Sequence, residues 1–288
     1  MNWIISFLTG RCHTTKTACS ESSPLSINLS IVQGSGIGPT LYIILESDLK
    51  PKSNVNIVFK YADDTNLLVP EHTDVQLCEE YEAIKIWALC NRMIINASKT
   101  KEIVFHRPNP RTSIVMPALQ AIEKIKETKL LGVIFSDGFH FDSHVNYILK
   151  ICSQRSYIMR KLRDQGLTIN QLNIVFDAII ISRIAYGACA WSGFLSVELI
   201  GRIDAFLRRM FRYGYCLRQI SFREISDKCD ISLFKGMLNS HSCIHQLLPS
   251  IKNEIKQLRP RGHRFTLPNC KSQLYKASFV NRCLFAYK

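Results

Sequence analysis

Two adjacent carboxylates, Asp63 and Asp64, stand between two apolar stretches of this 288-residue chain. Neighbouring carboxylates repel each other, and a shared cation removes that repulsion. Mg²⁺ prefers carboxylate oxygens and keeps waters and substrate phosphates as its other ligands. Two such ions about 4 Å apart can activate an attacking oxygen and stabilise a leaving one in phosphoryl transfer. Taken alone, the pair favours a solvated turn, because Asp bonds readily to its own backbone.

The segments on either side are expected to hold this pair at the tip of a β-hairpin. Val55, Ile57 and Phe59 alternate with residues 54, 56 and 58, which predicts a half-buried strand. The β-branched and aliphatic run at 65–69 predicts a second strand directly after it. The four residues 61–64 would then form the turn.

A glycine-rich loop precedes the hairpin by about 25 residues. It runs from Gln33 through Gly34 and Ser35 to Pro39, and the proline suits the first turn of a helix predicted over 40–49. Gly34 has no β-carbon, so a ligand can approach its backbone closely, and the Gln33 amide can bond a base or sugar edge. The alternative is a connector without a binding role.

The order of the predicted elements changes along the chain. A helix is expected over 74–91, capped by Thr73 or Asp74, followed by strands at 101–106 and 129–135. Helical patterns alone follow, at 141–163, 170–186 and 196–213, and the pattern weakens after residue 214. We therefore expect an α+β fold, with an antiparallel sheet and helices up to about Asp137 and an all-α region beyond it.

The net charge is as uneven as the predicted structure. Of the total of +14, residues 1–135 account for +1 and residues 136–288 for +13. Basic surfaces attract phosphate backbones through counterion release, although a high charge also favours solubility by itself. The asymmetry favours a polyanionic partner for the second half.

The amino-acid composition indicates in which cell compartment the protein is expected. The hydrophobic fraction of 47% is typical of a globular protein, no apolar run is expected to approach the ~20 residues that span a bilayer, and the start does not resemble a signal peptide. The eleven cysteines are scattered without a CxxC pair, which predicts reduced thiols. We expect an intracellular protein, nuclear or cytoplasmic, that is neither secreted nor membrane-bound.

The order and spacing of five sequence blocks resemble the palm of the reverse transcriptases of non-LTR (LINE-type) retrotransposons. The blocks are QGSGIGP at 33–39, ESDL at 46–49, YADD at 61–64, KTK at 99–101 and LLGV at 130–133. They are similar to the family's glycine loop, the end of its next helix, its catalytic hairpin, its lysine segment and the hairpin before its thumb. RPRGHRFTLP at 259–268 and RCLF at 282–285 resemble the C-terminal extension of these elements.

The resemblance implies an RNA-directed DNA polymerase that works by two-metal nucleotidyl transfer. Asp63 would hold Mg²⁺, with Mn²⁺ as the alternative ion, against the phosphates of the incoming nucleotide, and Asp64 would support the second ion or the primer end. Tyr61 and Ala62 would contact primer or template at the turn, with packing an equal alternative for Tyr61. Lys99 would neutralise or protonate the leaving pyrophosphate, with a solvated helix end as its alternative.

The same resemblance assigns partners and regions. An RNA template and a DNA primer or duplex would contact Gln33, Gly34 and Ser35 in the loop, and Leu131 and Gly132 beside the primer. A cluster of basic residues would meet backbone phosphates without reading sequence, unless it is only a solvated helix face; its members are Arg155, Arg160, Lys161 and Arg163. The predicted regions are a partial palm (1–137), a thumb-like helical region (138–190) and a helical extension (191–288).

The sequence departs from the family in ways that affect activity. Two-metal polymerases need three carboxylates, and the strand that supplies the third in this family is missing, as are the fingers and the endonuclease domain. The family's proline before the glutamine is replaced by Val32. We expect the chain to be truncated, to lack its upstream polymerase half and to be inactive alone. The alternative is a non-catalytic nucleic-acid-binding remnant of such an element.

Overall fold

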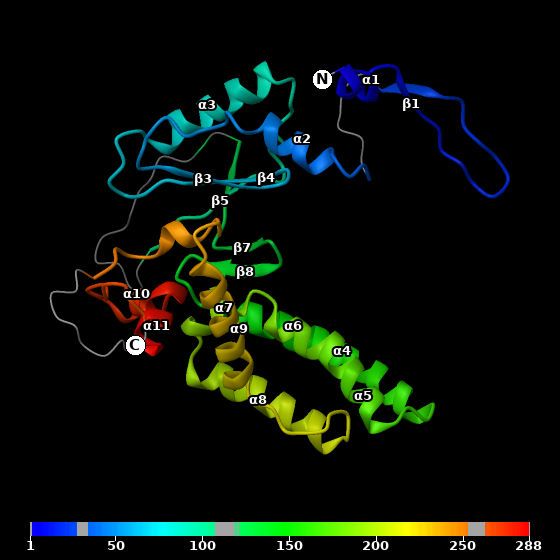
Figure 1. Ribbon diagram of the computed structural model, residues 1–288, viewed down its shortest axis with the longest axis vertical. Helices are drawn as coiled ribbons and strands as arrows, with labels where there is room; N and C mark the ends of the chain where they lie inside the picture. The colour runs from blue at the N-terminus through cyan, green and yellow to red at the C-terminus, as the bar shows by residue number, and fades with distance from the viewer. Residues whose placement is uncertain (1, 28–33, 107–118, 120, 253–262, 288) are drawn as a thin grey trace. The chain divides into compact units, whose positions relative to one another are not determined.

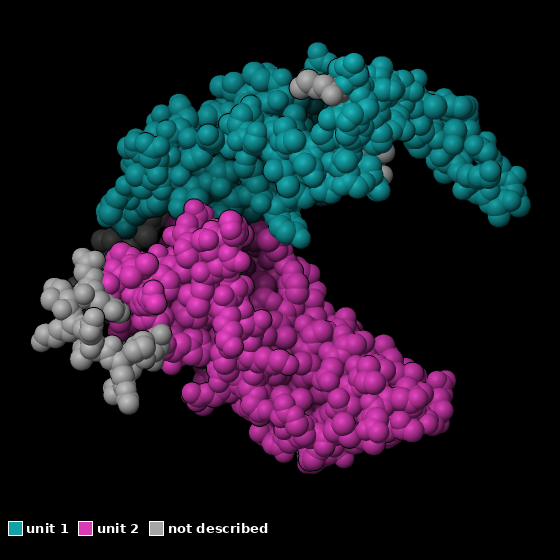
Figure 2. Space-filling view, in the orientation of Figure 1, with its two compact units in different colours: residues 1–100, 117–123 teal, residues 101–116, 124–288 magenta. Residues whose placement is uncertain are grey.

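The computed structural model (Figure 1) describes residues 2–27, 34–106, 119, 121–252 and 263–287. The chain divides into two compact units, coloured separately in Figure 2. Unit 1 comprises residues 1–100 and 117–123, and unit 2 comprises residues 101–116 and 124–288.

Unit 1 begins with a short helix and a small hairpin. Helix α1 (Asn2–Leu8) ends before Gly10, whose φ is +65°, and β1 (Arg11–His13) pairs antiparallel with β2 (Leu25–Ile27).

The rest of unit 1 contains the predicted carboxylate hairpin. Helix α2 (Gly38–Leu45) carries Pro39 in its first turn, as expected. Strands β3 (Ile57–Tyr61) and β4 (Asp64–Leu68) pair antiparallel, with Tyr61 opposite Asp64, and α3 (Leu77–Cys90) follows (Figure 1). The prediction of two strands joined by a turn at residues 61–64 is confirmed.

Two details of this region differ from the prediction. Ile57 and Phe59 are not half-buried but 43% and 54% exposed, whereas Val58 and Lys60 point inward. The cause is the Lys60 side chain, which binds the end of α2; since side chains alternate along a strand, Ile57 and Phe59 then face outward. Helix α3 begins three residues late, because Asp74 accepts a hydrogen bond from Ser53 instead of capping the helix.

The strands of unit 2 are shorter and more numerous than predicted. The expected strand at 129–135 is a hairpin of β7 (Glu127–Leu130) and β8 (Val133–Ser136), because the turn between them reverses the chain. The expected strand at 101–106 contracts to β5 (Lys101–Glu102), and β6 (Glu123–Lys124) was not foreseen. Backbone bonds from Ile125 to Glu102 (2.8 Å) and from His106 to Asp137 (3.0 Å) tie these segments together. The compact units therefore do not divide at Asp137; the functional division into palm, thumb and extension remains a prediction.

Helices form the remainder of unit 2, and the three long patterns predicted from the sequence are confirmed. They correspond to α4 (Asp142–Asp164), to α5 (Ile169–Phe176) continued by a π-helix (Asp177–Ile181) and α6 (Ser182–Ala185), and to α8 (Val197–Arg212). Gly187, with φ +61°, ends the second pattern. Further helices precede and follow α8; they are α7 (Ala188–Trp191), α9 (Phe222–Met237), α10 (Gln273–Ala277) and α11 (Phe279–Ala286). Helix α9 is as long as α8.

The core of unit 2 contains a cluster of buried aromatic rings. Trp191 is inaccessible, stacks on Phe222 at 5.4 Å between ring centroids and meets the edge of His144 at 5.0 Å. Trp191 is therefore a core residue of unit 2. Trp87 in unit 1 is only half-buried and donates to Asp48 at 2.9 Å.

Helix α9 was missed although its start is marked in the sequence. Ser221 and Glu224 form a reciprocal capping box at its N-terminus. Its buried Asp230 receives two hydrogen bonds of 2.7 Å from Arg282 of α11, which fixes the C-terminal helix to α9.

One stretch, Ile169–Phe194, is long and apolar enough to cross a membrane by length and composition alone, and an 18-residue window within it has a mean hydropathy of 1.5. The expectation that no run approaches that length was therefore wrong. In this fold the stretch is broken at Gly187, and it contributes Phe176, Ile180 and Ile184 to the core of unit 2.

Candidate active site

The Asp63–Asp64 pair lies at a two-residue hairpin turn. Ala62 and Asp63 form the turn, and Asp64 is the first residue of β4. Ala62 has φ +51°, because tight turns that match the twist of a hairpin need a positive φ at their first central residue. Both carboxylates and the Tyr61 ring are exposed. The turn thus presents two neighbouring acids to solvent.

Lys60 fixes the hairpin against the end of α2. Its ammonium donates to the backbone oxygen of Glu46 and, at 3.0 Å, to that of Leu49. The last carbonyls of a helix lack partners within the helix and carry partial negative charge, so a cation there is doubly favourable. The lysine directly before the YADD block therefore sets the position of the turn.

Tyr42 connects the same helix with the acids. Burial raises its pKa to about 12, and the hydrogen bond to Glu46 and the charges of Glu46 and Asp63 add to the effect. The phenol therefore stays protonated near Asp63. Gly34 and Ser35 lead into this helix, where the Gly38 amide donates to the Ser35 carbonyl at 3.2 Å. Gln33 lies outside the described residues.

A buried carboxylate holds the base of the hairpin. Glu80 of α3 is 1% exposed and accepts hydrogen bonds of 2.9 Å from the backbone amides of Lys52 and Ser53 and from the Asn56 side chain. Burial opposes ionisation, but these hydrogen bonds outweigh it, so the pKa of Glu80 is lowered.

Sequence analysis missed this supporting network. The available signals were a polar Asn56 within the strand pattern and an acid, Glu80, one residue before Tyr81 on the apolar face of the predicted helix. Neither residue touches the turn, so both act by positioning it.

The donor set suits a hard divalent ion but is incomplete. Two exposed carboxylates supply the oxygen ligands that Mg²⁺ prefers. Across the part of the chain that the structure describes, no group of three His, Cys, Asp or Glu side chains could hold a metal. Glu46 is hydrogen-bonded to Tyr42 and Asp48 to Trp87, so both are engaged in structural contacts.

The remaining predicted site residues outside α4 are Lys99 in unit 1 and the Leu131–Gly132 turn in unit 2. Lys99 is exposed in a turn stabilised by its own amide, which donates to the Asn96 carbonyl at 3.1 Å. Leu131 and Gly132 form the β7–β8 turn with φ +46° and +88°, and the Tyr186 hydroxyl donates to the Leu131 carbonyl at 2.8 Å.

The predicted basic cluster on α4 separates into engaged and exposed members. Arg155 donates to the carbonyl of Ile179 in the π-helix, and Arg163 donates to the carbonyl of Tyr213 at 2.8 Å. Arg160 and Lys161 are exposed and flank the Tyr157 ring. Only the latter two offer unoccupied charges to a ligand in this geometry.

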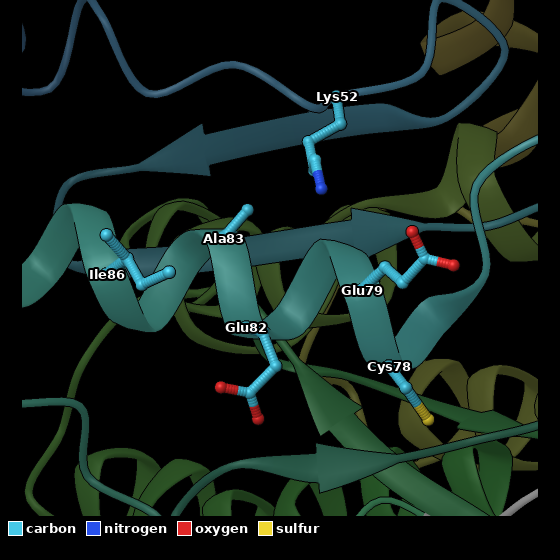
Figure 3. Close-up of a pocket in the computed structure, with 6 residues that line it drawn as sticks. All are labelled: Lys52, Cys78, Glu79, Glu82, Ala83 and Ile86. Atoms are coloured by element: carbon cyan, nitrogen blue, oxygen red, sulfur yellow. The ribbon is translucent and has the colours of Figure 1, made fainter.

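A shallow pocket of about 440 Å³ lies on α3 (Figure 3). It is lined by Lys52, Cys78, Glu79, Glu82, Ala83 and Ile86. None of the predicted site residues contributes to it, and its mixed lining does not indicate a ligand class.

RNA-directed DNA polymerases of mobile elements are the class of protein that the chain resembles. The RNA-directed DNA polymerase from mobile element jockey of Drosophila funebris is 30% identical over 154 residues, covering 49% of this chain and 17% of that protein. The probable RNA-directed DNA polymerase from transposon BS of Drosophila melanogaster is 23% identical over an alignment covering 91% of this chain and 32% of that protein.

These relatives confirm the resemblance to non-LTR retrotransposon reverse transcriptases. The chain spans between 17% and 32% of their length. No model of a protein family and no solved structure matches the chain.

Proposed function

We propose that this chain supplies the catalytic hairpin and the duplex-holding helices of an RNA-directed DNA polymerase of a non-LTR retrotransposon. The observation that carries the proposal is the exposed turn at Ala62–Asp63, which presents Asp63 and Asp64 in a chain similar to such polymerases. In this proposal, unit 1 contributes part of a polymerase palm and the helices of unit 2 act as the thumb.

The proposed site combines metal-binding, positioning and substrate-binding side chains. Asp63 and Asp64 would hold Mg²⁺ or Mn²⁺, and that ion would supply charge neutralisation at the reacting phosphates when bound. Lys60 and Glu80 hold the turn in place without touching substrate. Lys99 would meet the leaving pyrophosphate.

Nucleic acid would contact the two loops and the basic helix. The segment Gln33–Ser35 would face the template, and Tyr61 and Ala62 would lie beside the primer end. The Leu131–Gly132 turn would support the primer strand. Arg160 and Lys161 would contact backbone phosphates, which position a duplex without reading its sequence.

The ligand set limits what this chain does alone. Two-metal transfer needs a further carboxylate, and the described residues bring none to the Asp pair. We infer that the missing ligand and the triphosphate-binding residues come from polymerase sequence outside this chain. The second candidate, a non-catalytic nucleic-acid-binding remnant, is favoured by the +13 charge of residues 136–288.

Two assays on the purified full chain test the proposal. Fluorescence anisotropy with a labelled RNA–DNA duplex should show binding that weakens steeply with salt, and absence of binding would refute both candidates. Primer extension on an RNA template with Mg²⁺ should give no product, and clear product would show that the inferred missing ligand is not needed. A chimaera that adds the upstream region of the jockey polymerase should extend the primer and lose activity on Asp63→Asn; a chimaera that stays inactive would favour the remnant.

A further inference from the structure

Three elements of unit 2 bring two cations to one phenol. Lys129 on β7 donates to the hydroxyl oxygen of Tyr147 on α4 at 2.8 Å, and its ammonium lies 4.5 Å from the centre of that ring. The Arg183 guanidinium on α6 lies 5.3 Å from the same ring centre, and after the hydrogen bond from Lys129 its charge is among the causes that lower the pKa of Tyr147. None of these three residues was singled out by the sequence.

The cluster carries uncompensated positive charge. Within the described residues, neither Lys129 nor Arg183 has a carboxylate partner, and Glu127, the nearest acid along β7, accepts a hydrogen bond from Ser143 instead. His144, three positions before Tyr147 on α4, is neutral: burial lowers its pKa to about 4, and the charges of Arg183 and Lys129 contribute. The pKa of His144 therefore reflects the positive charges of Arg183 and Lys129, and the neutral imidazole adds no charge to the cluster.

Hydrogen-bond donors of this cluster remain available to a ligand. A phenol oxygen accepts through its lone pairs and has one O–H to give. Lys129 donates to the hydroxyl oxygen of Tyr147, and within the residues that the structure describes the phenol proton has no acceptor. Lys129 is exposed and retains further N–H groups. An anionic oxygen beside the phenol could accept from all three side chains.

We propose that Lys129, Tyr147 and Arg183 form a binding site for a backbone phosphate of a nucleic-acid duplex, an inference that rests on the proposed function. A phosphodiester suits the set, because the planar guanidinium and the ammonium both bind phosphate oxygens strongly when charge-assisted. The site adjoins the β7–β8 turn, since Lys129 is two residues from Leu131 and Arg183 is three from Tyr186, which binds Leu131. A strand held by that turn would thus meet a fixed phosphate contact that sets its position and not its sequence.

Duplex binding by the full chain tests this site, with an RNA–DNA duplex as the probe. Lys129→Gln should weaken binding about five-fold at moderate salt and reduce the salt slope by about 1. Tyr147→Phe removes the donor but no charge, so it should weaken binding about three-fold and leave the slope unchanged. Arg183→Lys keeps the charge but loses the planar fork, and an intermediate loss is expected.

Lys228→Gln on α9 is the matched control, because it removes one exposed lysine charge from the same unit. If Lys129→Gln and Tyr147→Phe bind like Lys228→Gln and the wild type respectively, the site is refuted while the proposed function stands. If the wild type itself fails to bind the duplex, the proposed function fails, and this inference fails with it. Near-UV circular dichroism of each variant separates lost contacts from lost folding.

Discussion

The two tight hairpins of this protein are built alike at their turns and differently beneath them. Ala62 and Leu131 both open their turns with positive φ, at +51° and +46°. Under the β7–β8 turn, Val133 is 5% exposed and belongs to the core of unit 2. Under the β3–β4 turn, Phe59 remains 54% exposed, and the anchors are polar: Lys60 and Glu80.

The β7–β8 hairpin therefore rests on a complete apolar core, whereas the β3–β4 hairpin does not. Unit 2 buries its own apolar residues around Trp191, so it can present charges such as Lys129 on a stable surface. The hairpin of unit 1 leaves the apolar side of β3 uncovered within the described residues. The position of the Asp63–Asp64 turn thus depends mainly on hydrogen bonds, and in our proposal polymerase sequence outside this chain completes the site.

Deleting a tryptophan side chain should give the largest difference in stability loss between the two units. Trp191→Ala removes an inaccessible indole and is expected to lower the free energy of unfolding of unit 2 by about 3–5 kcal/mol. Trp87→Ala, at a half-buried position, should cost less than half as much in unit 1. Urea titration followed by hydrogen exchange of each unit measures both, and equal losses would contradict the comparison.

Acidification should loosen the first hairpin through Glu80. Its pKa is lower in the folded than in the unfolded state, so its contribution is present above pH ~4.5 and is lost as pH falls through the folded-state pKa. Glu80→Gln should cost about 1–3 kcal/mol at neutral pH, because the paired amides lose a charged acceptor.

Hydrogen exchange of the β3–β4 amides reports this directly. The variant should flatten the acid dependence of their protection, while the β7–β8 amides serve as the internal control. An unchanged acid dependence in the variant would show that another group holds the hairpin.

The β7–β8 turn is fixed by side-chain packing as well as by its backbone conformation. Gly132 has φ +88°, and an added β-carbon would lie 3.1 Å from the Tyr186 ring. Gly132→Ala should therefore destabilise unit 2 by about 1–2 kcal/mol. Thermal unfolding measures the loss, and a neutral result would mean that Tyr186 moves without cost.

The first turn should respond in the opposite direction and by less. Ala62 adopts a left-handed conformation that glycine accepts freely, so Ala62→Gly should protect the β3–β4 amides by about 0.5–1 kcal/mol. Reduced protection would show that the alanine methyl group packs on a neighbour.

Local pattern was enough to predict the hairpin at residues 61–64 and the long helices of unit 2, because alternation and helical spacing each follow from one segment alone. The face of β3 was predicted wrongly, because Lys60 reaches the end of α2 and that contact is not local. The β7–β8 hairpin was predicted only through the resemblance of the LLGV block, because the local pattern at 129–135 predicted one strand and the reversal depends on Leu131 and Gly132.

The candidate site was predictable only where chemistry and motif coincide. Asp63 and Asp64 were found because adjacent acids between strands are conspicuous. Glu80, Asn56 and the Lys129–Tyr147–Arg183 cluster were not found, because each depends on segments that meet only in three dimensions.

The most direct test of the central claim is whether the Asp63–Asp64 turn binds a divalent ion. Mn²⁺ titration of the labelled full chain, followed by amide NMR, should broaden the signals of residues 61–65 first, and Asp63→Asn with Asp64→Asn should abolish that effect. Broadening that is absent from this turn, or that persists unchanged in the double variant, would contradict the assignment of these two aspartates as metal ligands.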